Sequence, residues 1–223
     1  MNKNIIRRLL QTLVTLILQT AILFITAGTV RWNWAWIYVL IGVVILSINL
    51  MVLPRAVIEE RGKKKENVKK WDKIITGINL VPTLGLFILA GLDHRLVWSG
   101  ISDPCIHIIG LVMVFMGSML FTWSMVVNTF FSTMVRIQDD RDHVVATGGP
   151  YRYVRHPGYV GYITMILGTP LALGSYMALS MSALVIMLLI IRTKLEDEVL
   201  QNELTGYMDY SKKVKYKLVP YLW

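Results

Sequence analysis

The sequence is poor in charged residues and in cysteine. Only 17% of its 223 residues are charged and 55% are hydrophobic, and the mean hydropathy is +0.54. This composition is typical of a membrane protein and not of a soluble domain. A single cysteine, Cys105, excludes an internal disulfide framework, and we expect it to be a small apolar filler. No zinc-type spacing, phosphate-binding loop or nucleophile elbow is present, so we expect no metal and structural roles for His94 and His107.

Acidic residues are also scarce. The 23 Lys and Arg outnumber the 14 Asp and Glu, which gives a net charge of +9. In a soluble protein this excess would indicate nucleic acid as a partner. Beside apolar spans, however, basic residues mark the cytoplasmic membrane face and contact lipid head groups. We therefore expect membrane lipids, and no nucleic acid, as partners.

Long uncharged runs predict an all-α integral membrane protein, because about 20 apolar residues cross the hydrocarbon core of a bilayer. The first three predicted spans are Leu9–Val30, Trp32–Leu53 and Ile74–Leu92. Leu9–Val30 is longer than the apolar core of a signal peptide, so we expect it to stay as the first membrane helix. The uncharged run Pro104–Val135 is too long for one span, so its membrane part is expected to end near Val127.

The run Pro157–Ile191 is uncharged but is interrupted by helix breakers. Gly168, Pro170 and Gly174 fall near its middle and predict a helical hairpin with two short arms. This C-terminal hairpin brings the expected total to about six membrane-embedded helices.

The basic residues also predict the orientation. Only Arg31 and Arg95 lie in loops expected outside, so both termini are expected to be cytoplasmic. The polar segment 136–159 and the polar C-terminal tail then share one membrane face. Arg55–Lys73 is expected to be a solvated connector and Asp93–Asp103 a short polar turn.

The stretch Gly148–Gly161 concentrates glycine, proline, aromatic, arginine and histidine residues in a short polar interval. Non-helical backbone near membrane depth usually lines a protein cavity, and ionisable groups there indicate a functional site. His143 and His156 can each donate or accept a hydrogen bond near neutral pH. Alternatively, Arg152 and Arg155 lie among phosphate head groups. We expect this stretch to form the floor of a site at the membrane face.

A second polar group follows the last apolar run. Arg192 and Glu196 are four residues apart and share one face of a helix. They form either an ordinary surface ion pair or part of a site. In a site, the arginine could hold an anionic substrate head, and the carboxylate could accept hydrogen bonds from hydroxyl or ammonium groups.

These two groups together resemble the isoprenylcysteine carboxyl methyltransferase family, which is related to phospholipid methyltransferases. The resemblance covers roughly residues 128–223 and is carried by His143–Tyr151, Arg155–Gly161, Arg192, Glu196-Asp197, Gly206-Tyr207 and Tyr210. It implies a membrane enzyme that uses S-adenosylmethionine without a soluble Rossmann fold and releases S-adenosylhomocysteine. Residues 1–127 would form N-terminal membrane helices, and residues 128–223 a catalytic half with a cofactor-binding linker, the helical hairpin and a cytoplasmic C-terminal helix. The acceptor would be lipophilic, either an isoprenylcysteine-like carboxylate or a phospholipid or other small lipophile.

The resemblance also implies residue roles. Arg192 would face the methyl acceptor, and Arg192 and Glu196 would be the catalytic residues. The cofactor would contact His143, Val144, Val145, Ala146, Tyr151, His156, Pro157, Gly158, Tyr159 and Glu196, with either Arg136 or Gln138 as a further polar contact. Two positions depart from the family pattern: Glu196-Asp197 replaces a Glu-Glu pair, and Ala146 replaces a larger aliphatic residue.

Two other functions are compatible with these residues. One is a membrane reductase that uses NADPH, since sterol-type reductases resemble this family in their C-terminal architecture. The other is a non-enzymatic transporter or scaffold, in which the polar stretch only anchors the protein at lipid head groups.

Overall fold

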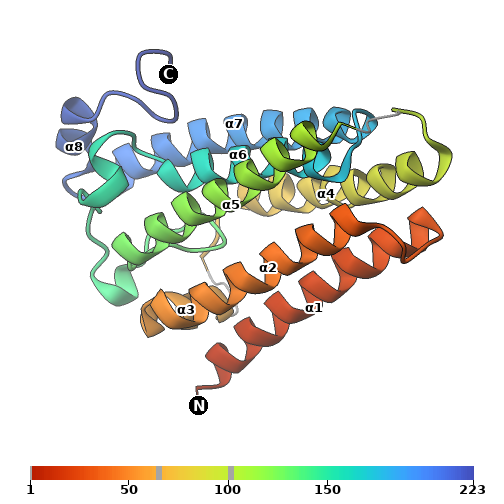
Figure 1. Ribbon diagram of the computed structural model, residues 1–223. Helices are drawn as coiled ribbons and strands as arrows, with labels where there is room; N and C mark the ends of the chain where they lie inside the picture. Colours follow the sequence, from red (N-terminus) through yellow and green to blue (C-terminus); the bar gives the residue numbers. More distant parts are fainter. Residues whose placement is uncertain (1, 64–66, 100–102) are drawn as a thin grey trace.

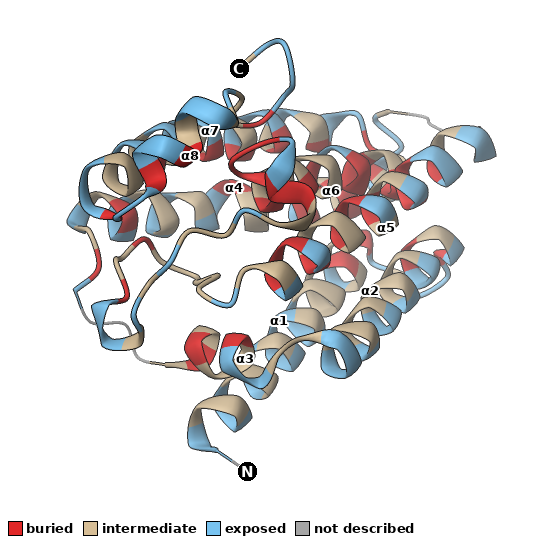
Figure 2. Cartoon of the chain, turned by 90° about the vertical axis from the view of Figure 1, so that its left-hand side faces the viewer, coloured by how far each residue is buried: buried red, intermediate tan, exposed pale blue. Residues whose placement is uncertain are grey.

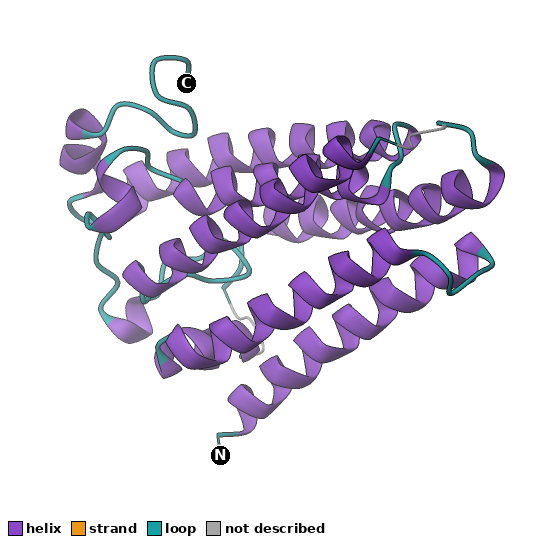
Figure 3. Ribbon diagram, viewed as in Figure 1, coloured by secondary structure: helices purple, strands orange, loops and turns teal. Residues whose placement is uncertain are grey.

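The computed structural model describes residues 2–63, 67–99 and 103–223, and these residues form helices and loops without a strand (Figure 3). Five helices are long and apolar enough to cross a membrane: α1 (Lys3–Ala27), α2 (Asn33–Val52), α4 (Lys70–Leu96), α5 (Pro104–Val127) and α7 (Met177–Glu203). The shorter elements are α3 (Arg55–Gly62), α6 (Pro157–Leu173) and α8 (Tyr207–Lys213), with 3-10 turns η1 (Asp139–Arg141) and η2 (Gly149–Arg152). The predicted all-α, multi-pass class is confirmed.

The helices form an elongated bundle in which α1 and α2 lie beside a tighter group of α4, α5, α6 and α7 (Figure 1). α1 packs on α3 and α4, and α5 packs along the whole of α6. The most apolar windows of α1 and α2 are only 6% buried, compared with 28–39% in α4, α5 and α7. Buried residues therefore concentrate in the second group (Figure 2). α3, α8 and both chain ends lie toward the same end of the bundle (Figure 1).

The apolar runs locate the helices, but the helices extend beyond them. α1 begins at Lys3 and α4 at Lys70, because helical hydrogen bonding continues through the polar residues that precede each run. α5 ends at Val127, as predicted. In contrast, the connector Arg55–Lys73 is not simply solvated, because it contains α3, in which Val57 and Glu60 are buried.

Two stretches of the predicted loops lie outside the described residues. These are residues 64–66 of the connector and residues 100–102 of the polar turn. Asp93, at the start of the predicted turn, is instead part of α4, where it accepts hydrogen bonds from Ser99 and Ser175. Cys105 is exposed, so the expectation that it fills a small apolar space is wrong.

Glycines allow α5 and α6 to pack at close range. A Cβ on Gly117 would lie 2.6 Å from the carbonyl oxygen of Gly161, and one on Gly161 would lie 2.5 Å from the carbonyl oxygen of Gly117. Seven residues away along both helices, a Cβ on Gly168 would lie 2.7 Å from the carbonyl oxygen of Gly110. Such small residues let helix backbones approach each other within a membrane. Gly168 is therefore a packing residue.

Only one of the three predicted helix breakers ends a helix. Gly174 has a φ of 72°, and its N–H donates to the carbonyls of Pro170 and Leu171 at the end of α6. The predictions for Gly168 and Pro170 are wrong, because both lie inside α6.

The two histidines outside the polar linker are held by packing. The ring of His107 stacks on Trp34 at 4.5 Å, and its Nδ1 lies 2.9 Å from the carbonyl oxygen of Ala172. The ring of His94 stacks on Trp32 at 4.2 Å. These contacts agree with the structural roles expected for both.

We expect Gly117→Leu to lower the Tm of the protein by about 5 °C, because an overpacked core costs about 1–3 kcal/mol. The measurement is thermal unfolding in detergent. Gly77→Leu is the matched control, since nothing lies within 4 Å of a Cβ at that position on α4. Equal effects of the two substitutions would contradict close α5–α6 packing.

Candidate active site

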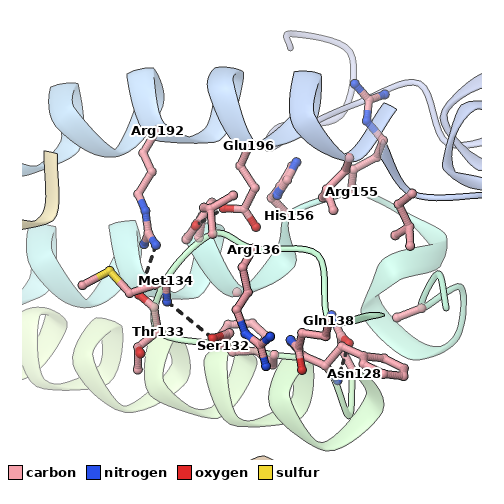
Figure 4. Close-up of a pocket in the computed structure, with 18 of the residues that line it drawn as sticks. Asn128, Ser132, Thr133, Met134, Arg136, Gln138, Arg155, His156, Arg192 and Glu196 are labelled. Carbon is pink, nitrogen blue, oxygen red and sulfur yellow. Dashed lines mark hydrogen bonds between the residues drawn. The ribbon is translucent and has the colours of Figure 1, made fainter. Parts of the chain in front are cut away.

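A cavity of about 310 Å³ lies among α3, α4, α5, α6, α7, α8 and the linker between α5 and α6. This volume falls within the range of small-molecule sites, about 300–1,000 Å³. Arg192 and Glu196 point from α7 toward the part of the linker that carries Arg136 and Gln138 (Figure 4). The polar linker and the last long helix therefore meet at one cavity.

Most of the predicted site residues line this cavity. They are Arg136, Gln138, His143, Val144, Val145, Ala146, Tyr151, His156, Gly158, Tyr159, Arg192 and Glu196. Pro157 does not line it; this residue is buried at the first position of α6. Among the described residues, no group of three or more His, Cys, Asp and Glu side chains could hold a metal ion.

Asp197 connects the linker to α7. Its side chain is fully buried and accepts two hydrogen bonds from Arg155, from Nε to Oδ1 at 2.7 Å and from Nη2 to Oδ2 at 2.8 Å. The Tyr207 hydroxyl donates to Oδ1 at 2.9 Å, and Nε2 of His156 lies 3.2 Å from the same oxygen. Burial and the adjacent Asp197 carboxylate raise the pKa of Tyr207, so its hydroxyl stays a donor. Gln201 donates to Oδ2 at 2.7 Å, so Asp197 contacts four side chains from the linker, α7 and α8.

Arg155 also binds the C-terminal tail. Its Nη1 donates to the carbonyls of Val214 and Lys215 at 2.9 and 2.8 Å, and its backbone N–H donates to the carbonyl of Tyr216 at 2.9 Å. The alternative that places Arg155 among lipid head groups is therefore wrong. Arg152 is exposed, and the same alternative stays open for it.

Arg192 forms no ion pair with Glu196. Instead its Nε donates to Oδ1 of Asp72 at 2.7 Å, and its Nη2 donates to the carbonyl of Thr133 at 3.1 Å. Asp72 is fully buried in the first turn of α4 and also accepts from the backbone N–H of Val135 at 2.7 Å. The ordinary surface-pair interpretation is wrong. Asp72 was not predicted as a site residue. An acidic residue among the basic residues that begin a membrane span could have indicated it.

Tyr159 lies between the two predicted catalytic residues. Its hydroxyl donates to Oε2 of Glu196, and Cζ of Arg192 lies 5.6 Å from its ring centroid. The ring of His156 is stacked against it, at 5.6 Å and an interplanar angle of 7°. Glu196 is only partly buried, and its carboxylate faces the cavity.

Arg136 and Gln138 both reach the cavity, so the choice between them as a cofactor contact stays open. Nη2 of Arg136 donates to Oε1 of the buried Glu60 at 3.0 Å, which ties the linker to α3. Gln138 is fully buried; it donates to the carbonyl of Phe130 at 2.6 Å and accepts from Arg141 at 2.7 Å.

His143 is held beside these residues in its neutral form. Its ring lies 4.6 Å from that of Phe130, and the backbone N–H of Gln138 donates to its Nδ1 at 3.4 Å. Burial, followed by the positive charges of Arg136 and Arg141, lowers its pKa to about 4. This part of the cavity therefore offers an uncharged imidazole at neutral pH.

Tyr151 closes the cavity from the side of α5. Its hydroxyl accepts from Asn128 at 3.3 Å and donates to the carbonyl of Ser124 at 3.4 Å. The Tyr210 hydroxyl donates to the Tyr151 carbonyl at 2.7 Å, which docks α8 on this turn. Burial raises the pKa of Tyr151, so it stays protonated. Gly158 is needed nearby, because a Cβ there would lie 2.7 Å from the Phe131 ring.

Comparison with known proteins places similarity on these same elements. A sequence model of the family described as "Phospholipid methyltransferase" matches residues 105–205. A protein-S-isoprenylcysteine O-methyltransferase from Schizosaccharomyces pombe is 41% identical over 56 residues, 25% of this chain and 24% of the relative. These matches confirm the resemblance to this group of methyltransferases over part of the chain. The enzyme of the same name from Xenopus laevis is 33% identical over 69 residues, 30% of this chain and 24% of the relative. The chain thus matches about a quarter of the length of these relatives.

We expect Asp197→Asn to destabilise the protein by about 3 kcal/mol or more, because it leaves Arg155 buried without its counter-charge. Thermal unfolding in detergent measures the effect, and limited proteolysis shows whether residues 214–217 have detached. Asp209→Asn is the control, since Asp209 pairs with Lys212 on the exposed surface. If Asp197→Asn is as harmless as Asp209→Asn, Asp197 does not hold these elements together.

An NMR titration of the His143 ring should show a midpoint near pH 4. The unfolded histidine binds a proton below about pH 6.5, whereas the folded one stays neutral, so stability is complete above pH 6.5 and falls as the pH drops toward 4. His143→Gln should reduce that loss between pH 7 and pH 5. A midpoint near 6.5 would show that the imidazole is not held in its neutral form.

Proposed function

We propose that this protein is an integral-membrane methyltransferase that transfers a methyl group from S-adenosylmethionine to a lipophilic acceptor, the carboxylate of an isoprenylcysteine-like molecule. One observation carries the proposal: the linker residues around His156 and the α7 residues Arg192 and Glu196 line a single cavity. The family model over residues 105–205 and the relatives named as protein-S-isoprenylcysteine O-methyltransferases support the same conclusion.

The groups that line the linker side of the cavity fit S-adenosylmethionine, which supplies an electrophilic methyl group on a sulfonium. Val145, Ala146 and Tyr151 give apolar and aromatic surface for a flat base. The Glu196 carboxylate, oriented by Tyr159, can accept hydrogen bonds from ribose hydroxyls or an ammonium group. The neutral imidazole of His143 adds no positive charge that would repel a sulfonium.

Arg192 is suited to hold the acceptor. Asp72 fixes its Nε and Thr133 accepts from its Nη2, while Nη1 donates to no described residue. That remaining edge can bind a carboxylate. A carboxylate is already ionised at neutral pH and needs no general base. The protein's contribution is then to hold the two reactants in line, which lowers the entropic part of the barrier.

An amine acceptor is the second candidate, because the matching family model is described as a phospholipid methyltransferase. An amine must lose a proton during transfer, so it needs a base within hydrogen-bond reach. Glu196 is the carboxylate that faces the cavity and would fill this role.

The proposed arrangement in the membrane has six embedded helices. α6 has 17 residues and is joined to α7 by the short turn after Gly174, so that the two would form the helical hairpin. Both termini and the cavity would face the cytoplasm, since the basic residues gather in the segments at that end. A water-soluble donor and a lipid-borne acceptor could then each reach the cavity from its own phase.

The test uses purified protein with labelled S-adenosylmethionine and either N-acetyl-S-farnesylcysteine or phosphatidylethanolamine vesicles, with the products identified by mass spectrometry. We expect a labelled methyl ester of the farnesylcysteine. Glu196→Gln should weaken S-adenosylhomocysteine binding by about tenfold, since one charge-assisted hydrogen bond contributes about 1.5 kcal/mol or more. Arg192→Met should instead raise the KM for the acceptor and leave that affinity nearly unchanged.

Other outcomes would decide for the alternatives. Label on phosphatidylethanolamine alone would establish a phospholipid methyltransferase. If the protein binds NADPH and does not bind S-adenosylhomocysteine, the methyltransferase proposal fails and the reductase is favoured. Saturable binding of neither would support a non-enzymatic protein.

A further inference from the structure

The cavity has a second region in addition to the linker side, formed by residues of α3 and α4. Arg61 of α3 lines it together with Thr76 and Asn79 of α4, and Arg192 of α7 lines the same cavity. We call this region the α3 arm. None of the three α3-arm residues belongs to the sequence motif of the linker or of α7.

Arg61 enters the cavity because α3 lies directly on α1. A Cβ at Gly62 would lie 2.0 Å from the carbonyl oxygen of Asn4, so α3 can pack this closely only with a glycine there. The preceding residue then points toward α5 and the linker, where Cζ of Arg61 lies 5.7 Å from the Phe121 ring and 5.5 Å from the Phe131 ring. Two aromatic rings thus fix the guanidinium group without neutralising its charge.

The Arg61 guanidinium has no anionic partner and forms no hydrogen bond in the described part of the chain. This distinguishes it from the other arginines of the cavity. Arg155 pairs with Asp197, Arg192 with Asp72 and Arg136 with Glu60. Burial, then the positive charges of Arg8 and Arg192, lower the pKa of Arg61 to about 9, so it is protonated at neutral pH. A partly desolvated charge of this kind favours an anion beside it.

Two buried oxygens of the α3 arm also lack partners. Thr76 Oγ1 and Asn79 Oδ1 make no hydrogen bond with any residue in the described ranges. Buried polar atoms are normally satisfied, so an unpaired pair that lines a cavity indicates polar groups of a ligand. Leu188 and Leu189 line the cavity as well and supply apolar surface.

We propose that the α3 arm binds the head group of the methyl acceptor, with Arg61 as a second cationic contact for its anionic group beside Arg192. Thr76 and Asn79 bind neutral polar groups of the same head, such as an amide. This inference rests on the proposed function and deepens it, because two arginines select a lipophilic acid and repel a protonated amine. Arg61 would therefore determine specificity for the acceptor and make no contact with the methyl donor.

The experiment compares the binding of N-acetyl-S-farnesylcysteine with that of its methyl ester to detergent-solubilised protein, without a methyl donor. The natural protein should prefer the acid by about tenfold or more, since the carboxylate accepts charge-assisted hydrogen bonds that its methyl ester cannot. Arg61→Met keeps an unbranched apolar side chain between the two phenylalanine rings and removes the charge. We expect it to reduce the preference at least fivefold, and Arg61→Lys to retain most of it.

Affinity for S-adenosylhomocysteine, measured in the same samples, distinguishes the possible failures. An unchanged preference in Arg61→Met would overturn the role of Arg61 while leaving the proposed function intact. If Arg61→Met loses S-adenosylhomocysteine binding and unfolds at a lower Tm, Arg61 has a structural role, and its proposed role in acceptor binding is overturned. If the natural protein binds the acid and its ester equally, there is no anionic subsite. Absence of S-adenosylhomocysteine binding in the natural protein would count against the proposed function alone.

Discussion

The ion pair between Arg155 and Asp197 is the interaction on which the candidate site depends. It joins the linker, α7 and the C-terminal tail through side-chain hydrogen bonds of one buried arginine. Burying such a pair is costly unless the remaining donors and acceptors are satisfied. Here they are, because Tyr207 and Gln201 bind the carboxylate and tail carbonyls bind the guanidinium. The walls of the cavity are thereby held at fixed positions.

Two further acid–arginine pairs repeat this design at neighbouring positions. Asp72 with Arg192 ties α4 to α7, and Glu60 with Arg136 ties α3 to the linker. In each pair the acid is fully or almost fully buried, whereas the arginine reaches the cavity. The carboxylates fix the orientation of the guanidinium groups, which is the preorganisation that binding sites require.

Local patterns were sufficient for part of this structure. The apolar runs predicted the long helices, and the motif from His143 to Gly161 identified part of the cavity's linker side. Most linker residues from Asn128 to Val135 line the cavity as well and were not predicted. Partners far apart in the sequence could not be predicted in the same way. Asp72 and Arg192 are separated by 120 positions, and only the fold brings them together. Gly168 was misinterpreted for a related reason: a glycine that breaks a helix and one that packs against another helix look alike until the neighbour is known. The roles of the site residues and the division at residue 127 stay predictions.

The position of α3 changes how the N-terminal helices are understood. The N-terminal helices have the composition of generic membrane anchors. The eight-residue helix α3, however, contributes two consecutive residues to the site: Glu60 holds the linker and Arg61 lines the cavity. If the α3 arm binds the acceptor, specificity for the acceptor is determined by the N-terminal half of the chain, which has no recognisable motif. Related chains could then share a donor site and differ in the lipids they modify, and sequence similarity over the C-terminal half would not reveal which lipid each one takes.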